Sequence, residues 1–189
     1  MDECRAFELT APDARLHASW LEAAAEFAGT GEYQHGSGLT PDGEPPRFGH
    51  TAWRPVELAD PERFAGFVAH LRSLTDPDVV RPLGMVPDTK LWLTADGTYL
   101  GAVSLRHELN DFLLAVGGHI GYSVRPSARR RGLATEALRR TLDVARGLRL
   151  ARVLVTCEDG NTPSARTIER NDGTLEDVRD GMRRYWITL

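Results

Sequence analysis

The second half of the sequence places one amphipathic helix between two strand-like segments, and this unit limits the fold more than any other feature. Residues 118–124 (G-H-I-G-Y-S-V) read as a strand that ends at Pro126, because proline cannot continue strand pairing. Residues 132–147 carry apolar side chains at helical spacing, and residues 152–157 (R-V-L-V-T-C) form a nearly continuous apolar run. A strand, a helix and a second strand in this order predict a parallel crossover within an α/β sheet.

Hairpin signals surround this unit. Asp96-Gly97 and Asp180-Gly181 each join two apolar segments and predict tight turns. The other predicted elements are a strand at 5–9, helices at 13–27, 61–74 and 162–171, and long loops at 28–52 and 75–90. From about residue 88 the order is β-β-β-α-β-α-β-β, which describes one mixed α/β domain spanning residues 1–189.

Composition and charge narrow the functional classes. The formal net charge is -4 and the isoelectric point is near 5.9, so nothing indicates a general affinity for nucleic acid or membranes. Cys4 and Cys157 form neither a disulfide framework nor a metal-ligand spacing. The N-terminus is acidic, and no apolar run approaches the roughly 20 residues that span a bilayer. We therefore expect a soluble cytoplasmic protein without a metal.

Three arginines stand where a helix begins. Arg129, Arg130 and Arg131 precede Gly132, although the helix dipole already makes this end positive. Free N–H groups of the first helical turn and a glycine that admits close approach suit an anion such as a diphosphate. The alternative is a solvated basic turn, because Lys90 is the only lysine among 23 basic residues and arginine is common throughout. The stretch is neither a P-loop nor a dinucleotide fingerprint.

The pattern Arg129-x-x-Gly132-x-Ala134 after H-I-G-Y-S-V resembles the acyl-CoA signature of the GNAT superfamily of N-acetyltransferases. The resemblance covers about residues 88–188. With R-H-E-L-N and the R-R-Y-W-I ending, it extends to a subgroup of predicted bacterial acetyltransferases. It implies a mostly antiparallel sheet, flanked by helices, whose central parallel strands splay apart. Residues 88–189 would bind CoA, and residues 1–87 would form the acceptor side.

The resemblance also implies roles for individual residues. The CoA diphosphate would be held by backbone amides and arginine side chains, and the pantetheine arm would lie along the preceding strand. One backbone N–H near Val124 would polarise the thioester carbonyl. Two positions on the later helix would contact the cofactor near its thiol. These cofactor-binding residues are Tyr122, Ser123, Val124, Arg129, Arg130, Arg131, Gly132, Leu133, Ala134, Thr135, Asn161 and Ser164.

The proton donors and acceptors are less defined. The tyrosine that often serves as general acid in this superfamily is replaced by Ile168, which leaves the acid unassigned. The catalytic candidates are His119, His107, Glu108 and Tyr122, and each histidine has a structural role as its alternative. Further candidates, each with a structural or solvated alternative, are Cys157 for a covalent step, Tyr185 and Trp186 for the acceptor pocket, Tyr33, His35 and His50 for acceptor recognition, and Asp111, Glu108 and Glu158 for attracting a cationic amine.

Three functions compete at this point. The first is an acetyl-CoA-dependent N-acetyltransferase in which a primary amine, on a small molecule or a peptide N-terminus, attacks directly in a ternary complex. The second is a non-catalytic module that binds or senses acyl-CoA, which Ile168 favours. The third, binding of nucleic acid through the arginines, is disfavoured by the net negative charge. The resemblance leaves a homodimer open.

Overall fold

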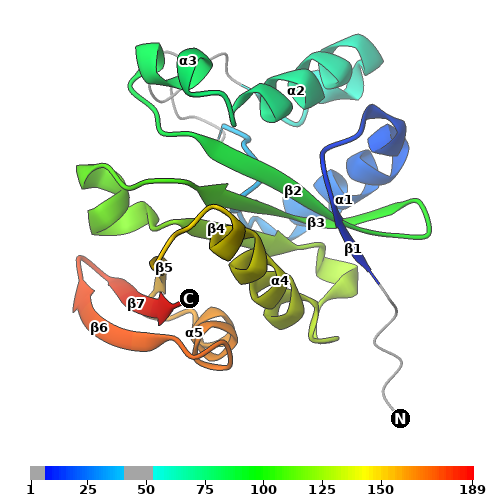
Figure 1. Cartoon of the computed structure of the whole chain (residues 1–189). Coiled ribbons are helices and arrows are strands. Elements are labelled where there is room, and N and C mark those ends of the chain that lie inside the picture. Colours follow the sequence, from blue (N-terminus) through cyan, green and yellow to red (C-terminus); the bar gives the residue numbers. More distant parts are fainter. Residues whose placement is uncertain (1–6, 41–52) are drawn as a thin grey trace.

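One seven-stranded sheet runs through the molecule (Figure 1). A computed structural model describes residues 7–40 and 53–189. The strand order is β1-β2-β3-β4-β5-β7-β6, and every neighbouring pair is antiparallel except β4 and β5. The strands are β1 (Glu8–Thr10), β2 (Asp88–Ala95), β3 (Thr98–Arg106), β4 (Ile120–Val124), β5 (Arg152–Glu158), β6 (Thr174–Arg179) and β7 (Met182–Thr188).

Helices cover both faces of the sheet and create two cores. On one face, α1 (His17–Thr30) and α2 (Pro61–Ser73) pack around Trp20, Phe64 and Trp92. On the other face, α4 (Leu133–Gly147) and α5 (Thr162–Glu169) pack against the strands (Figure 1). The predicted apolar stripe of α4 is buried as expected. Leu148 is the exception at 40% exposed, because the helix ends at Gly147 and the chain turns away.

The two parallel strands separate soon after they meet. The register joins Ile120 of β4 to Val155 of β5 and goes no further, although both strands continue beyond this pair. Gly118, with φ of 62°, turns the chain into β4, and the N–H of His119 donates to the carbonyl of Leu154 (2.7 Å). The expected mostly antiparallel sheet with splayed central strands is confirmed.

The first half of the chain contains more structure than the sequence predicted. Inside the expected loop at 75–90 lies the short helix α3 (Pro77–Val80), whose first turn is capped by the Asp76 carboxylate. The segment between β3 and β4 forms a π-helical stretch, Leu113–Gly117. Of the strand expected at 5–9, the structure shows β1, and residues 1–6 lie outside the described part. Of the loop expected at 28–52, residues 28–30 form the last turn of α1, and residues 31–40 have no helix or strand.

A charged cluster lies buried between the sheet and the α1–α2 layer. The Lys90 ammonium contacts the Asp88 carboxylate at 2.8 Å, and both side chains are about as buried as the apolar core. The Ser104 hydroxyl donates to both oxygens of Asp88 (2.9 and 2.8 Å). The pKa of Asp88 is lowered despite its burial, because Lys90, Arg106 and Ser104 stabilise the carboxylate. The single lysine of the sequence is therefore an internal residue.

Candidate functional site

The loop before α4 is shaped to receive an anion. Gly132 (φ 76°) and Arg130 (φ 62°) both adopt left-handed backbone conformations, which is unusual for arginine. Gly132 begins the helix without a side-chain cap, so the N–H groups of the first turn keep their hydrogen-bonding capacity. A Cβ built on Gly132 has no heavy atom within 4 Å. Exposed amides at a helix N-terminus after left-handed residues are a recurrent anion-binding arrangement.

The three arginines of this loop serve different purposes. Arg129 donates from Nε to the carbonyl of Val124 (3.0 Å) and pairs with Glu32 (2.7 Å), so it connects the loop after α1 to the end of β4. Arg131 donates to a backbone carbonyl within the loop. The Arg130 guanidinium is exposed and has no hydrogen bond or ion pair with any described residue. Of the three predicted cations, Arg130 is therefore the one most available to a phosphate.

Backbone groups of β4 line the opening between the parallel strands. Alternate residues of a strand direct their N–H and C=O groups to opposite neighbours. Just past β4, the N–H of Arg125 donates to the carbonyl of Leu100 in β3 (2.7 Å). By this alternation, the N–H and C=O groups of Tyr122 and Val124 point toward β5. Since the register with β5 ends at Ile120, neither finds a β5 partner in the described chain. The carbonyl of Val124 accepts from Arg129, so an extended ligand can pair with β4 at the Tyr122 backbone and at the Val124 N–H.

Ser123 departs from the expected pattern. Its backbone belongs to the ladder with Ala102 of β3, so the strand-like contact expected for all three residues is open only to Tyr122 and Val124. The Ser123 side chain is directed to the sheet face that also carries Gly121, away from α4 and α5. Its hydroxyl is buried and has no hydrogen-bond partner. Any contact between Ser123 and a ligand must come from that hydroxyl.

The Tyr122 side chain reaches the start of α5. Its hydroxyl lies 2.9 Å from the Ser164 hydroxyl, and Ser164 is also a neighbour of the Cys157 thiol. Burial raises the pKa of Tyr122 to about 12, and burial also raises the pKa of Cys157. Asn161 caps α5 by accepting the N–H of Ser164 (3.1 Å). Ile168 is fully buried in the core, so the position of the usual acid is closed and Tyr122 is the phenol nearest the opening.

His119 is held in a structural arrangement. Its side chain is 6% exposed, and Nδ1 accepts a hydrogen bond from the N–H of Leu154 (2.9 Å). The ring also contacts Trp186 edge-on at 6.3 Å. Burial and the nearby Arg106 lower the pKa of His119 to about 4, so it is neutral at physiological pH and a weak proton acceptor. This geometry favours the structural interpretation of His119 over the catalytic one.

His107 and Glu108 lie at the end of the sheet where β4 begins. His107 hydrogen-bonds the Thr89 hydroxyl through Nε2 (2.8 Å), and burial lowers its pKa. Glu108 pairs with Arg81 at 3.6 Å on the surface. Both follow β3 beyond its pairing with Ile120, at the closed end of the parallel pair. The structure therefore does not bring them together with the Tyr122 hydroxyl.

The described part of the loop after α1 lies against β4 on the face opposite α4. Gly36, with φ of 79°, contacts the backbone of Gly121 so closely that any side chain would collide with it. Gln34 and Ser37 are buried there, and the Gln34 Oε1 atom has no hydrogen-bond partner. Sequence reasoning missed Gln34 and Ser37. The only local signal was the Gly-Ser-Gly triplet, whose glycines both have positive φ.

Two other expectations for the acceptor pocket are resolved by side-chain direction. Tyr185 is 1% exposed and donates to Glu169 of α5 (3.1 Å), so it lies in the α4–α5 core. Trp186 lies on the opposite face, where Arg152 stacks on its ring at 4.0 Å and its Nε1 has no partner. The hydroxyl of Tyr33 donates to the carbonyl of Leu39. His50 lies outside the described residues.

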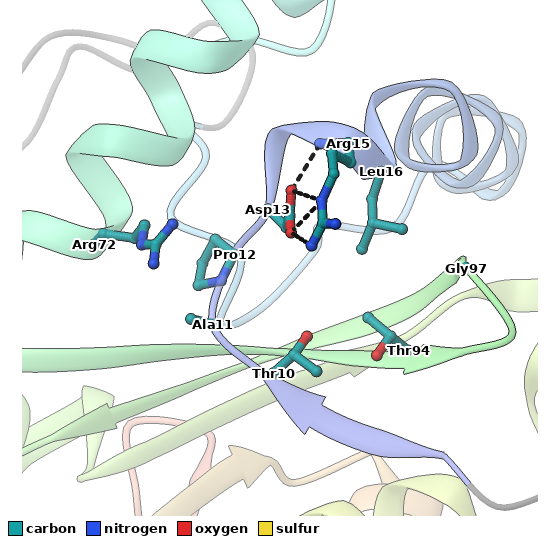
Figure 2. Close-up of a pocket in the computed structure, with 9 residues that line it drawn as sticks. All are labelled: Thr10, Ala11, Pro12, Asp13, Arg15, Leu16, Arg72, Thr94 and Gly97. Atoms are coloured by element: carbon teal, nitrogen blue, oxygen red, sulfur yellow. Dashed lines mark hydrogen bonds and ion pairs between the residues drawn. The ribbon is translucent and has the colours of Figure 1, made fainter.

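A pocket of about 570 Å³ lies elsewhere, between β1, the β2–β3 hairpin and the first helices (Figure 2). Asp13 and Arg15 form an ion pair at its rim (2.6 Å), and Arg72 approaches from α2. None of its lining residues belongs to β4, β5, α4 or α5. This pocket is therefore separate from the opening between the parallel strands.

Residues 51–174 match the family described as acetyltransferase (GNAT) domain, which is about two thirds of the chain. The chain belongs to this family. The exposed amides of the α4 loop fit the diphosphate of an acyl-CoA, and the Tyr122 backbone with the Val124 N–H fits its pantetheine arm. Among the described residues, no group of three or more acidic, histidine or cysteine side chains is arranged to hold a metal ion. No described helix is long and apolar enough to cross a membrane.

Solved structures with this fold cover almost the whole chain. The ribosomal L7/L12 alpha-N-protein acetyltransferase RimL in complex with coenzyme A is 16% identical, with a TM-score of 0.61, covering 98% of this chain and 95% of that one. The microcin C7 self-immunity acetyltransferase MccE, in complex with acetyl-CoA and AMP, is 14% identical with a TM-score of 0.63, covering 98% and 93%. A ribosomal-protein-S5-alanine acetyltransferase from Vibrio fischeri is 12% identical with a TM-score of 0.61, covering 96% and 92%. No curated protein sequence matches significantly.

Proposed function

We propose that this GNAT protein is an acetyl-CoA-dependent N-acetyltransferase that transfers an acetyl group to a primary amine by direct attack in a ternary complex. The observation that carries the proposal is the opening between β4 and β5. It leads from the exposed amides before α4 along the Tyr122 backbone and the Val124 N–H, which have no partner on β5. Two of the structural neighbours were solved with coenzyme A or acetyl-CoA, which supports the choice of cosubstrate.

The chain's own residues divide the work of binding. Amides from Arg130 to Thr135 hold the diphosphate, and the unpaired Arg130 guanidinium adds positive charge at the rim. The backbone of Tyr122 and Val124 binds the pantetheine arm as a neighbouring strand would. Bound there, the thioester supplies an activated acetyl group. The Val124 N–H, directed into the opening, polarises its carbonyl oxygen.

Tyr122 is the proposed proton donor to the leaving sulfur. With its pKa raised to about 12, the phenol is protonated at neutral pH. The hydrogen bond to Ser164 holds the hydroxyl at the start of α5, next to the thiol of Cys157. A positioned acid of this kind contributes roughly 10²–10⁴-fold to a rate. Tyr122, which lies on β4, thus takes the role of general acid, because the aliphatic side chain of Ile168 cannot donate a proton.

The acceptor is proposed to be a primary amine on a peptide or small molecule. Several structural neighbours are ribosomal-protein acetyltransferases, and one of them modifies the N-terminal serine of L7/L12. A polypeptide N-terminus is therefore the first acceptor to test. The proposed cytoplasmic location fits that choice of partner.

Two measurements test the proposed function. Calorimetric titration of the protein with CoA should show binding, and mixing protein, acetyl-CoA and an amine panel should release free thiol. A chain that does not bind CoA would overturn the proposal. The buried Ile168 favours one competing function, a non-catalytic CoA-binding module. A non-catalytic module would show saturable binding of CoA but would release no thiol from acetyl-CoA with any amine.

A further inference from the structure

The loop of residues 31–40 forms one wall of a site on the face of β4 opposite α4. Glu32 pairs with Arg129 beyond the end of β4, and Gly36 packs on Gly121 within the strand. The intervening residues therefore follow β4 along the opening. At Gly36, both the positive φ and the contact with the Gly121 backbone exclude any residue larger than glycine. This wall is fixed close to the point where β4 and β5 separate.

Two buried oxygens beside this contact have no hydrogen-bond partner. Gln34 is 4% exposed, with Oε1 unpaired, and Ser123 is 9% exposed, with Oγ unpaired. They lie two residues from Gly36 and from Gly121, the pair that holds the loop on the strand. A buried polar atom left unpaired costs about 1–3 kcal/mol. An amide oxygen accepts only, and a hydroxyl accepts as well as donates, so a hydrogen-bond donor is the one kind of partner that satisfies both groups.

The charges around these oxygens suit a cation. His35 contacts the Tyr33 ring at 5.0 Å, and its electrostatic neighbours are Glu158 and Arg106. The Arg106 guanidinium is committed to the carbonyls of residues 117 and 118 (2.9 and 3.1 Å). Glu158 ends β5 across the opening from Ser123, is exposed, and has no ion pair with a described residue. An uncommitted carboxylate therefore faces the loop.

We propose that Gln34, His35, Ser123 and Glu158 form the subsite that binds the acceptor amine, a subsite that rests on the proposed function. The amine donates to the oxygens of Gln34 and Ser123, and Glu158 attracts its ammonium form. His35 takes the ammonium proton. The nitrogen lone pair then forms the N–C bond, the C–S bond breaks with its electron pair on sulfur, and the sulfur takes the Tyr122 proton. The amide nitrogen loses its second proton through solvent to the Tyr122 phenolate, and His35 releases the first proton to solvent.

The proton acceptor also selects the class of amine. Burial lowers the pKa of His35 below its ordinary value, so at neutral pH the ring is an uncharged but weak base. An α-amine, with a pKa of about 8, gives up its proton far more readily than a lysine-type amine with a pKa of about 10.4. The difference corresponds to about 300-fold in the fraction of uncharged amine. The subsite therefore favours the α-amine of a peptide.

The experiment uses two matched peptides. One has a free N-terminal alanine and no lysine, and the other is N-acetylated and carries a single lysine. We expect kcat/KM for the α-amine peptide to exceed that for the lysine peptide at least 100-fold. Gln34→Leu and Glu158→Gln should each raise the KM for the peptide about tenfold and leave CoA affinity unchanged. Glu62→Gln, an exposed change on α2, is the matched control and should leave both unchanged.

His35 is tested by its titration as well as by rate. His35→Gln should lower kcat about 10- to 100-fold. It should also remove the loss of rate at acidic pH, because that loss arises when the ring is protonated and can no longer accept a proton. NMR titration of His35 in Glu158→Gln should show a lower pKa than in the wild type, because a nearby carboxylate stabilises the charged ring.

Several results overturn the subsite: wild-type KM in Gln34→Leu and Glu158→Gln, a preference for the lysine peptide, or an unchanged His35 titration. A chain that binds CoA but acetylates neither peptide also overturns it. Failure to bind CoA rejects the proposed function itself.

Discussion

Replacing Gly132 with glutamate should abolish most CoA binding while leaving the protein folded. A Cβ built on Gly132 meets no heavy atom within 4 Å, so a side chain can start there without a steric clash. Its left-handed backbone (φ 76°) costs about 1–2 kcal/mol with any L-residue, which corresponds to a fall in Tm of roughly 2–8 °C. A carboxylate about 6 Å from two phosphate charges costs about 1.5–5 kcal/mol at effective dielectric constants between 80 and 20. The Kd for CoA should therefore rise about 10- to 5,000-fold.

Calorimetric titration with CoA at two salt concentrations measures this effect. The loss of affinity should shrink at high salt, because the repulsion is exposed and screened. Gly132→Ala carries the same backbone cost without the charge, and it separates strain from electrostatics. Gly84→Glu is the matched control, since Gly84 is exposed, has φ of 74° and also meets no atom within 4 Å. An unchanged Kd in folded Gly132→Glu, or an equal loss in Gly84→Glu, would refute the placement of the diphosphate.

Three further outcomes follow from the structure. Tyr122→Phe should lower kcat about 10²–10⁴-fold in the thiol-release assay, while the Kd for CoA changes less than twofold. Lys90→Met should lower the free energy of unfolding in urea by about 3–5 kcal/mol because it strands the buried Asp88 carboxylate, and adding Asp88→Asn should recover most of the loss. His119, with its pKa lowered to about 4, binds a proton more readily in the unfolded chain, so stability falls as pH drops from about 6.5 to 4. In His119→Gln that pH-dependent loss should be smaller by about 3 kcal/mol, which urea unfolding at pH 7 and pH 4 can measure.

The elements that the sequence predicted well are those whose signals are local. The Asp96-Gly97 turn, the stripe of α4 and the apolar run of β5 each lie within a short stretch, and each appears with nearly the expected bounds. The order of these elements, together with the GNAT resemblance, indicated a splayed parallel pair. Helix α3 was missed because the prolines of its segment read as a loop, although Pro77 lies at the first turn, where proline is tolerated.

What the sequence could not supply was the pairing of residues far apart in the chain. Glu32 pairs with Arg129 across 97 positions, a contact that the motif alone did not indicate. His119 looked like a base by its place on the strand, yet its Nδ1 is taken by Leu154. Gln34 carries no recognisable motif, and only its burial without a partner marks it. Such features depend on tertiary contacts that no local pattern encodes.

Because Ile120 and Val155 form the single paired position between β4 and β5, the sheet consists of two halves with little backbone pairing between them. Strands β1 to β4 form one half and β5 to β7 form the other, and the described strands show no further register between the two halves. A pantetheine arm bound between β4 and β5 would hydrogen-bond to the first half and pack against the second. A bound acyl-CoA would thus also stiffen the sheet, and release of CoA after each turnover would make the boundary between the two halves more mobile.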